Sequence, residues 1–196
     1  VIHELGVVLE GQERYPESER LHGEALTMWQ DLFPGGHPEQ ARSYEAMART
    51  VERQGRWVEA DSLYREAIAL WRGEYGDNHS QIATIHANRA NLSYLAGDFE
   101  AAAAAYRNGI AIWRANREQR LLAAGLRNLG VIERERGLLV SSDTLLGEAL
   151  DIRLELHGPR HPDVAEVHSA LAGLRNRQGR YGDAEEAART AVEQYE

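Results

Sequence analysis

Residues 38–72 read PEQARSYEAMARTVERQGRWVEADSLYREAIALWR, and this stretch predicts two amphipathic helices joined by a tight turn. Apolar residues recur at helical spacing as far as Gln54, and Pro38 suits the first turn of a helix. Gly55 ends that helix, and a second apolar face follows after Trp57. The second face consists of Ala60, Leu63, Tyr64, Ala67, Ile68 and Trp71. The stretch therefore indicates a pair of antiparallel helices.

The same pattern recurs along the whole chain at intervals of 40 or 42 residues. Four independent series share this period. They are the turn glycines Gly55, Gly97, Gly137 and Gly179; the small residues Ala25, Ala67, Gly109, Ala149 and Ala191; the tryptophans Trp29, Trp71 and Trp113; and the connector histidines His37, His79 and His161. A period of this length is typical of a solenoid built from stacked helix pairs. Small residues at fixed places allow paired helix axes to approach closely.

The repeat resembles the tetratricopeptide repeat, in the lengthened 42-residue form of kinesin light chains and of many bacterial regulatory proteins. The resemblance rests on Leu5-Gly6, Met47-Ala48, Leu129-Gly130 and Leu171-Ala172 in first helices, and on Ala60-x-x-x-Tyr64-x-x-Ala67 and Ala102-x-x-x-Tyr106 in second helices. It implies an all-α fold: a right-handed superhelical solenoid of about five antiparallel helix pairs. Arg89 at the leucine step of the third unit, Ser142 and Leu146 in the fourth, and Ala188 in the fifth depart from the pattern.

We expect a single array over residues 1–196, with units at about 1–36, 37–78, 79–118, 119–160 and 161–196. The chain starts at Val1 without an initiator methionine, which suggests an excerpt of a longer protein. Without capping helices, Ala187, Ala191 and Val192 should be exposed, and self-association through the ends is possible. The shortened spacing around residues 114–121 predicts a tighter connection and a bend near residue 120.

Composition excludes several classes of function. The chain of 196 residues has 22 arginines and no lysine or cysteine, with a net charge of -9. Disulfides and thiolate sites are therefore impossible, and the acidic balance argues against nonspecific nucleic-acid binding. No apolar stretch is long enough to span a membrane. We expect a cytoplasmic protein, and the arginine-rich usage suggests a bacterial source.

The sequence offers no convergent set of acid, base and nucleophile, so we expect neither an enzyme nor a cofactor. His157 and His161 are four residues apart, but Gly158 and Pro159 between them prevent a regular helix, so we expect no metal site. The three connector histidines instead indicate a structural role in the turn. His86 and His168 are expected to be packed, and the run from Glu133 to Arg136 is expected on a solvated helix face.

The surface most informative about function is the stripe of first-helix residues that faces the concave side of a superhelix. We define eight of these as the groove residues: Arg49, Arg53, Asn88, Asn91, Tyr94, Arg127, Asn128 and Arg134. Arginine suits carboxylates, and asparagine can bond both the donor and the acceptor of a peptide unit. In the resembling family, asparagine at the places of Asn88, Asn91 and Asn128 commonly holds peptide backbone. The expected partner is a protein or peptide segment that is acidic or presents its C-terminus.

Other interpretations remain open from the sequence. Glu45 with Arg49, and Glu52 with its neighbouring arginines, can neutralise each other as helix-surface pairs. The array can also act as a regulatory sensor that binds a signalling peptide or ligand and controls an attached effector, with residues 114–121 as its hinge. A third possibility is an assembly module that self-associates through its ends.

Overall fold

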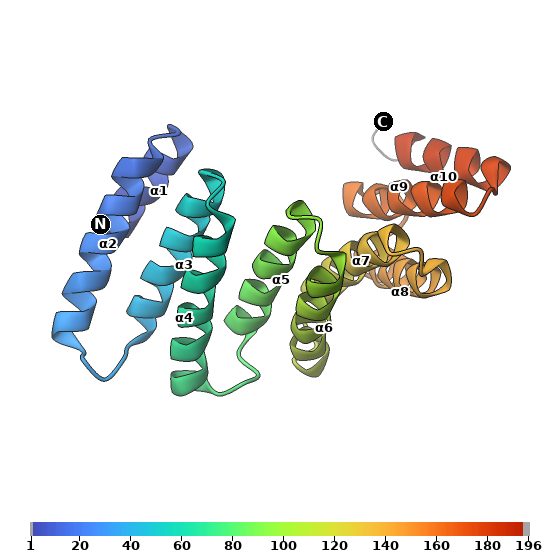
Figure 1. The fold of residues 1–196 in the computed structure, drawn as a ribbon. Coiled ribbons are helices and arrows are strands. Elements are labelled where there is room, and N and C mark those ends of the chain that lie inside the picture. Colours follow the sequence, from blue (N-terminus) through green and yellow to red (C-terminus); the bar gives the residue numbers. More distant parts are fainter. Residues whose placement is uncertain (1, 194–196) are drawn as a thin grey trace. The chain divides into compact units, whose positions relative to one another are not determined.

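The computed structural model describes residues 2–193, and these residues form ten α-helices (Figure 1). In chain order they are α1 (Ile2–Gly11), α2 (Tyr15–Leu32), α3 (Pro38–Arg53), α4 (Trp57–Tyr75), α5 (Ser80–Leu95), α6 (Phe99–Ala115), α7 (Gln119–Glu135), α8 (Leu139–His157), α9 (Pro162–Arg177) and α10 (Tyr181–Glu193). Odd-numbered helices are the first helices of the five pairs, and even-numbered helices are their partners. The prediction of an all-α solenoid of helix pairs is confirmed.

The connector histidines begin the first helices. His37 Nδ1 accepts a hydrogen bond from the backbone N–H of Glu39 at 3.1 Å, and His161 Nδ1 accepts one from Asp163 at the same distance. These contacts satisfy backbone donors that a helix start leaves without partners. The predicted structural role of the histidines is therefore confirmed.

The turns inside the pairs need a left-handed backbone conformation. Gly55 has a φ of 75°, and Gly97, Gly137 and Gly179 have φ values of 74° to 78°. Glycine adopts this conformation without the strain that a Cβ causes. Glu13 occupies the equivalent place in the first pair with a φ of 60°, so this turn is built without glycine.

The core lies between paired helices, where small residues permit close contact. Ala48, Ala60 and Ala67 are fully buried, and Tyr64 fills the larger space beside them. A Cβ on Gly130 of α7 would lie 2.8 Å from the Leu146 side chain of α8, closer than packing allows. The repeated small residues thus set the distance between partners.

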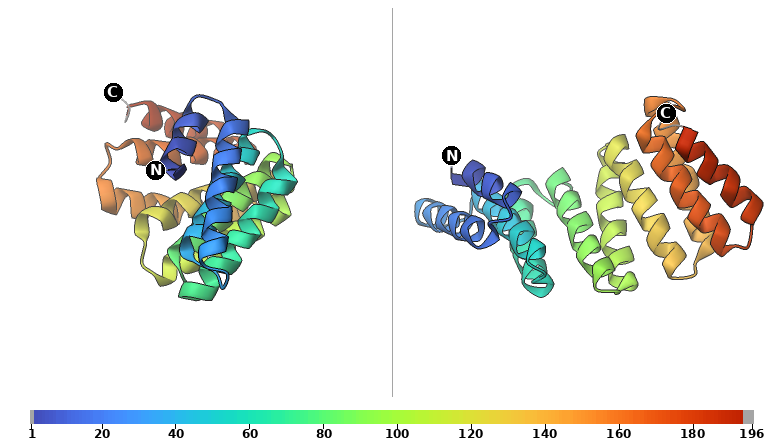
Figure 2. Two further views of the ribbon diagram at one scale, coloured as in Figure 1. Left: turned by 90° about the vertical axis from the view of Figure 1, so that its left-hand side faces the viewer. Right: turned by 90° about the horizontal axis from the view of Figure 1, so that it is seen from above.

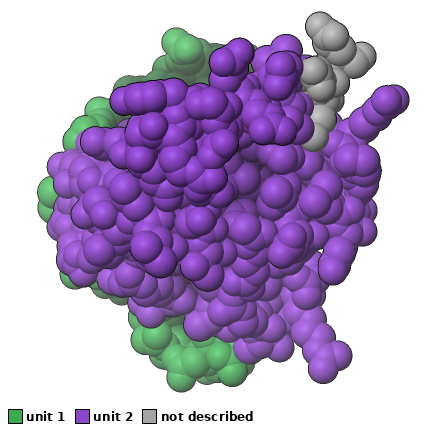
Figure 3. Space-filling view, turned by 90° about the vertical axis from the view of Figure 1, so that its right-hand side faces the viewer, with its two compact units in different colours: residues 1–92 green, residues 93–196 purple. Residues whose placement is uncertain are grey.

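The chain forms two compact units, residues 1–92 and 93–196, shown in separate colours in Figure 3. The division falls inside α5 and not near residue 120. The predicted tighter connection at that place is confirmed: it consists of residues 116–118, and Glu118 N–H bonds to Trp113 O at 2.9 Å. Within residues 93–196, α9 and α10 lie side by side in all views (Figure 2).

The last pair gives a mixed result for the expected exposure. Val192 is exposed, Ala187 is half-buried, and Ala191 is buried because α10 packs closely on α9. Over residues 2–193, the structure contains no helix of the length and apolarity that crossing a membrane requires.

Candidate functional site: the exposed face of the first helices

Arg49 and Arg53 lie on α3, in the unit of residues 1–92. Arg49 is half-buried and Arg53 is exposed, and neither forms an ion pair with any described residue. The expected ion pair between Glu45 and Arg49 does not form, because the Glu45 carboxylate has other partners. The two arginines therefore remain available to an external carboxylate.

Glu45 was expected on the open face, and this was wrong: its side chain is buried. Trp71 Nε1 donates a hydrogen bond to Glu45 Oε1 at 2.5 Å, and Gln81 Nε2 donates one to Oε2 at 2.7 Å. Glu52 likewise accepts a hydrogen bond from Tyr64 OH at 3.1 Å. Both carboxylates thus connect helices.

Burial raises the pKa of the Glu45 and Glu52 carboxyls above their ordinary value, although hydrogen bonds and the nearby charge of Arg49 act in the opposite direction. Burial and the Glu52 carboxylate also raise the pKa of Tyr64. The raised pKa values indicate that nearby cations only weakly compensate the burial of the Glu45 and Glu52 carboxylates.

Asn88 and Asn91 lie on α5, three residues apart and so on neighbouring positions of one helix face. Asn88 is half-buried and Asn91 is exposed. His86 on the same helix is packed, as expected, and burial lowers its pKa to about 4. It is therefore neutral at physiological pH and adds no charge to this face.

Arg127 and Asn128 lie on α7, in the unit of residues 93–196, and both have internal partners. Asn128 Nδ2 donates to Tyr106 OH at 2.8 Å, and its Oδ1 accepts from Arg127 Nη1 at 2.7 Å. Arg127 Nη2 contacts Glu166 Oε2 of α9 at 2.6 Å, whereas Arg127 Nε is buried without a hydrogen-bond acceptor among the described residues. Arg127 and Glu166 border two cavities, of about 140 Å³ and 370 Å³.

The last two groove residues, Arg134 and Tyr94, also contact other side chains of the protein. Arg134 contacts Glu135, its neighbour on α7, at 2.7 Å, and that carboxylate also contacts Arg177 of α9 at 3.0 Å. The Tyr94 ring packs against Phe99 with centroids 5.5 Å apart. As peptide-binding residues, all eight groove residues stay a prediction.

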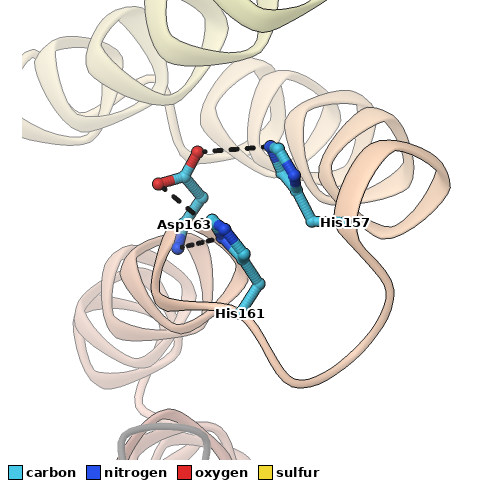
Figure 4. Close-up of side chains that lie close together, drawn as sticks. All are labelled: His157, His161 and Asp163. Atoms are coloured by element: carbon cyan, nitrogen blue, oxygen red, sulfur yellow. Dashed lines mark hydrogen bonds and ion pairs between the residues drawn. The ribbon is translucent and has the colours of Figure 1, made fainter.

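His157, His161 and Asp163 come close together where α8 is connected to α9 (Figure 4). The two imidazole rings are stacked, with centroids 4.0 Å apart, and Asp163 lies 3.5 Å from His157 Nε2. Arg153 pairs with the same Asp163 carboxylate, and this cation opposes a metal ion there.

The same stacking occurs elsewhere without a second histidine. Phe33 stacks on His37 with centroids 4.3 Å apart, and Tyr75 stacks on His79 at 4.7 Å. His157 takes the place of Phe33 and Tyr75 in the repeat. The pair of histidines is therefore explained as a connector stack.

The expectation that residues 133–136 form a solvated face was wrong for Glu133. Its side chain is buried, and its carboxylate binds Arg107 of α6 and, at 2.8 Å, Arg136. Desolvating a carboxylate is costly unless cations and hydrogen bonds compensate, as two arginines do here. Glu133 thus connects one helix pair with the preceding one.

A polar cluster in the first two helix pairs was not predicted from the sequence. Glu10 accepts a hydrogen bond from Thr50 at 2.7 Å, and the buried His22 lies 3.3 Å from the same oxygen. Burial raises the pKa of Glu10, but hydrogen bonds from His22 and Thr50 bring it below its ordinary value. The available signal was a polar residue at Thr50, where later first helices have leucine or isoleucine.

Comparison with known proteins identifies the repeat. A family model described as tetratricopeptide repeat matches residues 1–72, 47–115 and 121–196. No curated protein sequence matches the chain. Among solved structures, BtubC (BKLC) from P. vanneervenii superposes with a TM-score of 0.89 at 22% identity, covering 99% of this chain and 78% of that one.

Two further solved structures have the same fold. A putative kinesin light chain from Podospora anserina gives a TM-score of 0.85 at 17% identity, covering 99% of this chain and 93% of that one. Aspartyl phosphate phosphatase F from Bacillus subtilis gives 0.83 at 13% identity, covering 98% and 49%. The family match extends over most of the sequence, and the chain belongs to the tetratricopeptide repeat family.

Proposed function

We propose that this chain is a protein-interaction module that binds an acidic peptide segment, or a peptide C-terminus, along the exposed face of its first helices. The family and its fold support an interaction scaffold in general. The location of the binding site is the more specific part of the proposal. It is centred on Arg49 and Arg53, with Asn88 and Asn91 as contacts to peptide backbone.

One observation carries the proposal. Arg49 and Arg53 have no carboxylate partner among the described residues, although Glu45 and Glu52 lie on the same helix. Those carboxylates are turned to Trp71, Gln81 and Tyr64. A guanidinium without an internal partner binds an incoming carboxylate without first breaking an ion pair, which favours net affinity.

The asparagines complete the recognition. An asparagine side chain offers both a carbonyl acceptor and an amide donor, which match the N–H and C=O of one peptide unit. In the unit of residues 93–196, Arg127 is held by Glu166, so an acidic ligand has to displace that carboxylate there. We therefore place the stronger contacts on the α3 and α5 residues.

The experiment is a fluorescence-anisotropy titration with labelled peptides containing alternating Asp and Glu, and with the same peptides carrying Asn and Gln. The test variant is Arg49→Gln/Arg53→Gln. The matched control is Arg20→Gln/Arg42→Gln, which removes the same charge from the same unit at arginines that already pair with Glu24 and Glu39.

The wild type and the control should bind the acidic peptides alike, and the test variant should bind at least about tenfold more weakly, because charged hydrogen bonds are lost. An equal loss of affinity in both double variants would show that the acidic peptides are bound only by general charge attraction. Equal affinity for acidic and amide peptides would refute the proposal.

A further inference from the structure

An acidic side chain recurs six residues after the turn in four of the second helices. These residues are Glu19, Asp61, Asp143 and Glu185. Three of them contact an arginine of the following helix pair: Glu19–Arg56 at 2.6 Å, Asp61–Arg89 at 2.6 Å and Asp143–Arg175 at 2.8 Å. An ion pair at this position is thus a repeated feature of the contact between consecutive pairs.

Glu185 on α10 has the same position but no such partner. It is exposed and forms no ion pair with any described residue. Ala188, three residues after Glu185 on α10, lines the cavity of about 370 Å³ together with Ala191 and Val192 of α10 and Ser169 and Ala172 of α9. The ion-paired Arg127 and Glu166 also line this cavity. This end of α9 and α10 therefore combines an unpaired carboxylate with a hollow.

The repeat shows what fits such a hollow. Leu146 of α8 forms a buried apolar cluster with Ala170 and Leu174 of α9, the next first helix. Ala188 is the counterpart of Leu146 and is exposed, so the equivalent space on α10 is open. An apolar residue at the position of Leu174 on another helix would fill it.

The first helix of this chain carries that residue. Val8 of α1 is the counterpart of Thr50, Ile132 and Leu174, which are at most 2% exposed, yet Val8 is 54% exposed. Leu5, one turn earlier on α1, is 50% exposed. An exposed apolar side chain at a position that is buried in the later pairs, as Val8 is, indicates a docking face.

Arg14 follows α1 as Arg56 follows α3, and Arg56 is the arginine that binds Glu19. Arg56 is held by Glu59 at 2.5 Å and points Nη1 at Glu19, to which Gln54 also donates at 2.9 Å. Arg14 is held by Glu17 in the same manner at 2.6 Å, and its Nη1 contacts Gln12 at 3.1 Å. Gln12 and Arg14 thus repeat Gln54 and Arg56, without the carboxylate that those residues bind.

We propose that a second copy of this chain docks its α1 onto α9 and α10, so that Arg14 and Gln12 of one copy bind Glu185 of the other. In this contact Val8 packs over Ala188 and continues the internal repeat from one copy to the next. The two faces differ, so the contact is heterologous and adds copies head to tail.

Sedimentation velocity over a wide range of protein concentration tests the contact. The wild type should show an average sedimentation coefficient that keeps rising with concentration. Arg14→Glu and Glu185→Arg should each weaken self-association at least about tenfold, because each places like charges opposite each other. Both sites are exposed, so both variants should keep the helical circular dichroism of the wild type.

Combining the two charge reversals distinguishes the proposed contact from other modes of association. Arg14→Glu mixed with Glu185→Arg, or both changes in one chain, should restore association, because opposite charges then meet again at every contact. Glu186→Arg has the same charge change on the neighbouring exposed residue and should associate like the wild type. Val8→Glu should weaken association without disturbing the ion pair.

A wild type that stays monomeric at every concentration would overturn the proposal. So would association that is unaffected by either charge reversal, or a mixture of the two variants that fails to regain it. If another helix already covered the face of α9 and α10, the wild type would likewise stay monomeric.

Discussion

Trp71 Nε1 donates a hydrogen bond to Glu45 Oε1 at 2.5 Å, and this contact decides the character of the neighbouring surface. Glu45 lies one helical turn before Arg49 on α3, the spacing of a helix-surface ion pair. With its carboxylate turned to Trp71 and Gln81, Arg49 is left without an internal partner. The charge available on the α3 face is therefore positive, although the chain has a net charge of -9.

The first prediction concerns the pH dependence of Glu45. Burial raises its folded-state pKa, so the folded protein holds this proton more tightly than the unfolded chain does. The stabilisation is complete below the ordinary value of 4.5 and is lost as pH rises through the raised value. Relative to Glu45→Gln, the wild type should lose unfolding free energy between acidic and neutral pH, measured by urea denaturation. A constant difference between the two proteins would contradict this.

A second prediction separates two asparagines that look alike in the sequence. Asn128→Ala removes the hydrogen bond to the buried Tyr106 hydroxyl and should cost about 1 kcal/mol of unfolding free energy. Asn88→Ala should change stability by less than about 0.5 kcal/mol, because no hydrogen bond of its side chain to a described residue is seen. Chemical denaturation of both variants checks the contrast, and equal costs would refute it.

The buried Glu133 carboxylate should be important for stability. Glu133→Ala leaves Arg107 and Arg136 without their shared partner and should cost about 2–3 kcal/mol. Glu148→Ala breaks an exposed pair with Arg114 and should cost under about 1 kcal/mol. Thermal unfolding followed by circular dichroism should order the two variants in this way, and the reverse order would show that Glu133 is not a bridging residue.

The helical repeat was predictable from the sequence because its signals are local. Gly55 and its counterparts terminate helices by backbone geometry, and His37 begins one through a contact two residues away. Glu45 and Glu133 could not be placed in the same way. Their partners Gln81 and Arg107 lie 36 and 26 residues away, on other helix pairs. The residue pattern of one helix face carries no information about other helices, whereas burial of these carboxylates depends on how neighbouring helix pairs pack.

Glu13 offers a prediction about the turn of the first pair. Its φ of 60° is unfavourable for a residue with a Cβ, and the equivalent turn residue in the other four pairs is glycine. Glu13→Gly should raise the free energy of unfolding by up to about 1 kcal/mol, after the greater flexibility of the unfolded chain is subtracted. Gln119→Gly, in the first turn of α7, should not stabilise. Urea denaturation that shows Glu13→Gly to be destabilising would contradict the strain argument.

The most direct test of peptide binding follows the proposed contacts one by one. In nuclear magnetic resonance spectra of the full chain, addition of an acidic peptide should shift the Nε–H signals of Arg49 and Arg53 and the side-chain amide signals of Asn88. The Nε–H signals of Arg42 and Arg20, which already pair with glutamates, should stay in place. Saturable shifts at these proposed contacts, without shifts at Arg42 and Arg20, are the predicted result, and shifts that omit Arg49, Arg53 and Asn88 would contradict it.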